Sequence, residues 1–77
     1  MATAELAQRF LNRESIPGVY FQHNDRVRIA SGEHLGKIGW LVTVLQLEPE
    51  PKYVVELESG HDAKVLQSEL RKEDADT

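Results

Sequence analysis

Three glycines stand within the eight residues at 32–39, and an apolar run follows them at once. A phosphate-binding loop needs Gly-Lys-Ser/Thr at the start of a helix, or G-x-G-x-x-G between a strand and a helix. Here Lys37 is followed by apolar residues typical of a strand, so neither arrangement is present. We therefore expect Gly32 and Gly36 to shape a loop, Gly39 to leave room in a curved strand, and no cofactor to bind.

The remaining reactive side chains are scattered along the chain. There is no cysteine, which excludes a thiol nucleophile, a disulfide and a zinc–thiolate site. The histidines lack the short ligand spacing of a metal site, so we expect solvated turn residues at His23, His34 and His61. Glu56 and Glu58 alternate as charges on an outer strand face do, and no serine has a base at motif spacing. The sequence therefore predicts no catalytic residue, no metal site and no enzymatic activity.

The composition favours a small acidic domain. The chain has 77 residues and a formal net charge of −4, and from residue 48 onward nine acidic residues stand against four basic ones. So short a chain forms one domain with a thin core, and its average charge repels a nucleic-acid backbone. The longest apolar run, at 40–45, is too short to span a bilayer, and the first residues lack the pattern of a secretory signal. Together with the absence of cysteine, this favours a cytoplasmic protein without a membrane partner.

An amphipathic helix is expected at the N-terminus, within residues 1–16. The spacing of the apolar residues predicts helix over 3–13. Its apolar stripe consists of Leu6, Ala7, Phe10 and Leu11. Pro17 and Gly18 then end the segment, because proline disfavours helix at the residue before it. A helix of this length is marginal alone in water, so the stripe should pack against another element.

Short strands are expected after the helix. Alternating side chains and the turn residues between them predict strands at 19–22, 26–30, 37–47, 52–58 and 63–70, the last with room for one helical turn. A tight turn with Gly60 joins the last two strands. Residues 71–77 are small or charged and are expected to form a disordered acidic tail. About five antiparallel strands with tight turns favour an all-β fold, a small barrel over residues 19–70 beside the short N-terminal α-helix.

The stretch NDRVRIASGEHLGKIGWLVTVL, at 24–45, resembles the KOW motif of SH3-like barrels. That motif has a polar turn before V-x-I, a loop ending in glycine, a basic residue, a glycine and V-x-x-V. The corresponding residues here are Asp25, Val27, Ile29, Gly32, Gly36, Lys37, Gly39, Leu41 and Val44. The resemblance covers residues 23–70 approximately and implies an SH3-like barrel. Because the family includes ribosomal proteins and transcription elongation factors, it also implies a small binding module that contacts RNA or protein in such an assembly.

Four polar side chains in this region are candidates for contacting a partner. Arg26, Arg28 and Lys37 are the bases of the motif region, and His34 lies in the loop between them. Three bases give only weak, salt-sensitive attachment to RNA, and the loop itself contributes no lysine or arginine. A protein partner is therefore favoured, with weak RNA binding as a further possibility.

Ile38 and Trp40 are expected to point away from the interior, because the motif gives Gly39 and Leu41 the inward positions. Three explanations for two outward apolar residues stay open. The N-terminal helix covers them, Trp40 is an anchor for a protein partner, or a local bulge returns its ring to the core.

An acidic protein-only partner is the alternative function, in the class of inhibitors, immunity proteins or accessory subunits that bind no nucleic acid. Its acidic side chains would face a basic partner and steer the encounter. These side chains are Glu48, Glu50, Glu56, Glu58 and Asp62. For either function the chain is expected to be a monomer or a weak dimer.

Overall fold

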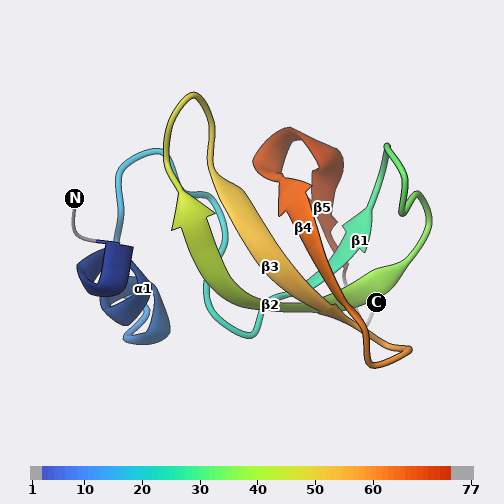
Figure 1. Cartoon of the computed structure of the whole chain (residues 1–77), viewed down its shortest axis with the longest axis horizontal. Coiled ribbons are helices and arrows are strands. Elements are labelled where there is room, and N and C mark those ends of the chain that lie inside the picture. Colours follow the sequence, from blue (N-terminus) through green and yellow to red (C-terminus); the bar gives the residue numbers. More distant parts are fainter. Residues whose placement is uncertain (1–2, 74–77) are drawn as a thin grey trace.

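The computed structural model describes residues 3–73, in which one helix precedes five antiparallel strands (Figure 1). The elements are α1 (Thr3–Leu11), β1 (Arg26–Ile29), β2 (Ile38–Gln46), β3 (Lys52–Leu57), β4 (Asp62–Leu66), the 3-10 helix η1 (Gln67–Glu69) and β5 (Leu70–Lys72). The strands form one open sheet in the order β4-β3-β2-β1-β5, so β4 and β5 are its edges. The expected β-rich fold of five antiparallel strands and a short N-terminal helix is confirmed in this form. No helix within residues 3–73 has the length and hydropathy needed to cross a membrane.

Gly39 allows β2 and β3 to approach each other closely. It lies opposite Leu57 in the register of the two strands. A Cβ atom at position 39 would lie 2.3 Å from the carbonyl oxygen of Glu56 and 2.8 Å from Cγ1 of Val55. Because no side chain fits into that gap, glycine is what lets the long strand bend over β3 here.

A bulge in the middle of β2 changes which residues face the core. The pairing with β3 shifts between Leu41 and Thr43, so that Val42 is the extra residue. Leu41 is the buried position before the shift and Val44 is the buried position after it. Trp40 lies before the bulge and stays on the outer face, where it is 38% exposed. The bulge therefore does not return its ring to the core.

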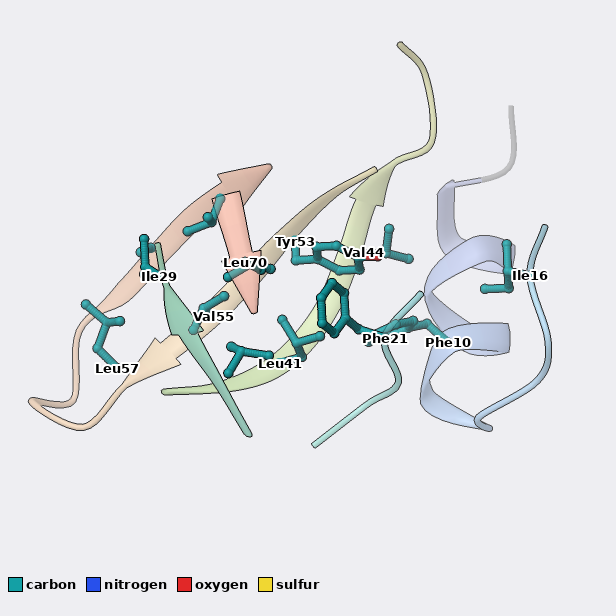
Figure 2. Packing of buried hydrophobic residues seen from close by; sticks show 13 residues of the cluster. Phe10, Ile16, Phe21, Ile29, Leu41, Val44, Tyr53, Val55, Leu57 and Leu70 are labelled. Carbon is teal, nitrogen blue, oxygen red and sulfur yellow. The ribbon is translucent and has the colours of Figure 1, made fainter. Parts of the chain in front are cut away.

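The core lies on the inner face of the curved sheet, around the fully buried ring of Tyr53 (Figure 2). Two aromatic rings pack against it, with centroids 5.9 Å away for Phe10 and 5.7 Å away for Phe21. The buried apolar residues are Phe10, Ile16, Phe21, Val27, Ile29, Leu41, Val44, Tyr53, Val55, Leu57, Ala63, Val65 and Leu70. Every strand contributes to this cluster, and α1 closes one end of it through Phe10.

Helix α1 lies at the end of the sheet, beside the last part of β2 (Figure 1). Phe10 is buried in the core and Leu6 packs against it, whereas Leu11 is 45% exposed. The hypothesis that this helix covers Ile38 and Trp40 is wrong, because its stripe packs on the inner face and both residues lie on the outer one. The open end of the core, next to Tyr53, offers the helix more apolar contact than the outer face around Trp40 does.

Residues 19–22 do not form the predicted strand. The main-chain N–H of Tyr20 donates to Oε1 of Gln67 at 3.0 Å, and Nε2 of Gln67 donates to the carbonyl of Gly18 at 3.0 Å. The hydroxyl of Tyr53 also donates to Oε1 of Gln67. One side chain from η1 therefore fastens the segment before β1 to the core. The local β pattern was misleading because the backbone groups are satisfied by a residue 47 positions away.

The prediction that residues 71–77 form a disordered tail is wrong for the described part of that range. Arg71 and Lys72 belong to β5, which pairs antiparallel with β1 through Arg28 opposite Arg71. The N–H of Glu73 donates to the carbonyl of Arg26 at 2.9 Å. Burial of Leu70 holds this strand in place despite its charged composition. Residues 74–77 lie outside the described range.

Candidate functional site

Trp40 is at the centre of the outer face of the sheet. In the register of β1, β2 and β3 it lies directly between Arg26 and Glu56. The guanidinium carbon of Arg26 is 5.9 Å from the centroid of the indole ring, within the range of a cation–π contact. The ring is 38% exposed, so one of its sides is open to a partner.

A second row of residues runs beside the Trp40 row. Ile38 lies opposite Arg28 on one side, and on the other its carbonyl accepts from the N–H of Glu58 at 3.0 Å. Arg71, on β5, lies directly opposite Arg28, so the two side chains share one face. We name the two rows together the Trp40 face, which consists of Arg26, Arg28, Ile38, Trp40, Glu56, Glu58, Asp62 and Arg71.

Ion pairs already engage two of the predicted RNA-contacting bases. Nη2 of Arg26 is 3.3 Å from Oε2 of Glu58. Nε and Nη2 of Arg28 donate to the two carboxylate oxygens of Glu73, at 3.0 and 3.1 Å. This hydrogen bonding raises the pKa of Arg28 and lowers the pKa of Glu73. The basic strip expected for a phosphate backbone is therefore largely neutralised by the protein's own carboxylates.

The charges on the Trp40 face are segregated by sign. Arg28 and Arg71 are directly opposite each other on its β1–β5 side, and Glu56 and Asp62 are directly opposite each other on its β3–β4 side. Like charges in cross-strand pairs destabilise a sheet. Within residues 3–73, Glu56, Asp62 and Arg71 form no ion pair that would relieve this. The face thus has a basic side, on which Arg26 and Arg28 are already paired with carboxylates, and an acidic side, with apolar residues between them.

A hollow of about 230 Å³ adjoins this face next to Ile38. It is lined by Gly36, Lys37, Ile38, Leu57, Glu58 and Ser59. The loop before β2 and the turn after β3 therefore meet at the same end of the sheet. Lys37 is the one predicted partner-binding base at this hollow, next to the face but outside its two rows.

His34 does not join the other predicted partner-binding residues. It lines a separate cavity of about 270 Å³ between β4 and the loop after β1, together with Lys52, Lys64 and Glu69. Glu69 has a structural part there, because its Oε1 accepts from the N–H of Leu66 at 3.1 Å. A Cβ atom at Gly32 would lie 2.6 Å from the other carboxylate oxygen, so the loop approaches Glu69 at a glycine with φ of +92°.

Two other predicted side chains have different surroundings from those expected. His23 is not a solvated turn residue: its Nδ1 is 2.9 Å from the carbonyl oxygen of Val42, and Phe10 packs edge-on against it. Glu50 is engaged within the chain and does not extend toward a partner: its carboxylate accepts from the N–H and hydroxyl of Ser68 at 2.8 and 3.3 Å. Among the described residues, no group of three His, Asp or Glu side chains is close enough to hold a metal ion.

Arg71 is the member of the Trp40 face that the sequence did not indicate. Its neighbours in the chain are charged, and the pattern of the last residues resembles a tail more than a strand. The available signal was Leu70, an isolated apolar residue that had to be buried and so turned the next residue outward.

The chain was compared with known proteins at the level of family models, curated sequences and solved structures, and none of them matches it.

Proposed function

We propose that this protein is a non-enzymatic, protein-binding module and that the Trp40 face is its docking surface. The observation that carries the proposal is an outward tryptophan between a basic side and an acidic side, left uncovered by the one helix of the described structure. Aromatic residues and arginine are the side chains most enriched at the energetic centres of protein interfaces. The face combines both, and its charges add orientation to the contact.

The proposal includes the SH3-like barrel of KOW domains as its architecture. The glycine bend and bulge of β2 support it, because these features curve a sheet. The pairing of β5 with β1 supports it as well, since it joins the last strand to the first. A cytoplasmic location in a transcription or translation assembly belongs to the same proposal and follows from the resemblance over residues 24–45.

Protein is a better-supported partner than RNA. Of the bases on this side of the molecule, Arg26 and Arg28 are paired with carboxylates, and the acidic side of the face repels phosphate. Trp40 is the one aromatic residue of the face, whereas a protein surface that binds single-stranded nucleic acid uses several aromatic side chains on which successive bases stack.

Photo-crosslinking in the native host tests the docking surface. Benzoylphenylalanine replaces Ile38, which lies on the face, or Leu35, which is 65% exposed in the loop outside it. We expect a protein crosslink from position 38 that disappears with Trp40→Ser, and none from position 35. Equal crosslinks from both positions would contradict the proposal.

A titration of labelled single-stranded RNA at low salt tests the other partner class. We expect no binding up to high micromolar protein. Binding that weakens steeply with salt and is lost with Arg28→Glu would replace the protein partner by RNA.

A further inference from the structure

Across β1, β2 and β3, the charges of the Trp40 face are arranged antisymmetrically about β2. In the row of Ile38, Arg28 is on the β1 side and Glu58 is on the β3 side. In the row of Trp40, Arg26 is on the β1 side and Glu56 is on the β3 side. Each row therefore reads arginine, apolar residue, glutamate from one side of the strand to the other.

Such a face is complementary to itself. When two copies stack face to face about a two-fold axis parallel to β2, the β1 side of one lies over the β3 side of the other. Arg28 then opposes Glu58 of the second copy, Arg26 opposes Glu56 of the second copy, and the two tryptophans meet at the axis. An axis across the strands would instead place arginine over arginine, so the charges select one orientation.

We propose that a second copy of this chain occupies the Trp40 face, in a two-fold dimer whose axis follows β2. The proposal rests on the proposed function, since it names an occupant of the same docking surface. Self-pairing places Arg26 of the second copy over Glu56, which forms no ion pair within residues 3–73, and so relieves the like-charge contact of Glu56 with Asp62. A protein partner that uses this face must displace the second copy, so dimerisation competes with partner binding.

The dimer is expected to be weak. A standard stable interface takes about 800 Å² and about 20–30 residues from each partner. The Trp40 face has only eight residues, on a chain whose whole accessible surface is 4897 Å². We expect dissociation in the range of about 10 μM to about 1 mM, where a tighter partner readily displaces the second copy.

Sedimentation equilibrium over that concentration range tests the dimer. For the wild-type chain we expect the apparent mass to rise from 8.7 kDa toward twice that value. The double variants Arg26→Glu/Arg28→Glu and Glu56→Arg/Glu58→Arg should each stay monomeric, because like charges then face each other. Mixed in equal amounts, the two should associate again. Glu33→Arg/Glu48→Arg carries the same charge change as Glu56→Arg/Glu58→Arg, on exposed residues outside the face, and should dimerise like the wild type.

Fluorescence gives a second measurement, since Trp40 is the single tryptophan. Dilution of the wild-type chain should shift its emission to the red, and Trp40→Ser should sediment as a monomer while keeping the wild-type circular dichroism. A monomer throughout the range, a dimer that survives Trp40→Ser, or charge variants that do not associate when mixed would each overturn the dimer. A monomeric chain that still crosslinks a protein from position 38 overturns the dimer and leaves the docking function standing. A dimer with no other crosslinked protein keeps the dimer and limits the docking function to self-association.

Discussion

The inner and the outer face of the sheet each hold one large aromatic side chain from the central strands. Tyr53, on the inner face, is fully buried and is flanked by the rings of Phe10 and Phe21 (Figure 2). Trp40, on the outer face, is 38% exposed and has the guanidinium of Arg26 over its ring. The same strands supply both faces, because successive side chains alternate.

This difference shows how a very small domain divides its apolar residues. The helix contributes its best apolar residue, Phe10, to the inner face, where it completes the core. Helix α1 is therefore not placed over Trp40, which stays 38% exposed. We therefore expect substitutions on the inner face to reduce stability and substitutions on the outer face to reduce binding.

The largest effect should come from Gly39→Val, at the point where β2 and β3 approach each other closely. The new side chain would overlap the carbonyl of Glu56, which is backbone and cannot move aside. We expect a loss of more than about 3 kcal/mol in the free energy of unfolding, measured by urea denaturation. Gly60→Ala is the control, because no atom lies within 4 Å of its added Cβ and only its positive φ is strained. An equal loss in both variants would contradict the close approach.

The second effect concerns the two sides of α1. Phe10→Ala removes a buried ring next to Tyr53 and should cost about 3–5 kcal/mol. Leu11→Ala, in the same helix, truncates a side chain that is 45% exposed and should cost less than about 1 kcal/mol. Thermal unfolding of both variants measures the difference. Similar losses in both variants would contradict the packing of α1 on the inner face through Phe10.

A smaller effect is expected from the titration of Tyr53. Burial raises the pKa of its phenol to about 12, against about 10 in an unfolded chain. The neutral form is thus favoured by folding, and its contribution is complete below pH 10 and lost as the pH rises to about 12. We expect the urea midpoint to fall across that window in the wild-type chain. In Tyr53→Phe this component of the fall should be absent. If the urea midpoint of Tyr53→Phe falls with pH as steeply as that of the wild type, the contribution of Tyr53 is contradicted.

The smallest effect on stability should come from Trp40→Ser. Trp40 is 38% exposed and has the guanidinium of Arg26 over its ring, so we expect a change below about 1 kcal/mol in the free energy of unfolding. The same substitution should abolish the crosslink from position 38 and the dimer. A loss as large as that of Phe10→Ala would place Trp40 with the core and would remove the distinction between the faces.

Local spacing of apolar residues made much of the fold predictable from the sequence. The helix, the strand from Arg26 and the long strand follow from local spacing, whereas the outward positions of Ile38 and Trp40 were expected from the resemblance over residues 24–45. The segment at 19–22 was misassigned because Gln67, far away in the chain, takes its hydrogen bonds. The acidic side of the face was partly visible in the sequence, whereas Arg71 depended on a long-range strand pairing that charged residues do not signal.

The pairing of the first strand with the last also sets the order in which this chain can fold. The hairpins β1–β2, β2–β3 and β3–β4 join neighbouring segments and can form early, whereas the pairing of β1 with β5 joins segments more than forty residues apart. Arg28 and Arg71 meet only in that late step. We therefore expect an incomplete chain to present Trp40 without its full set of arginines, so that correct docking requires the finished fold.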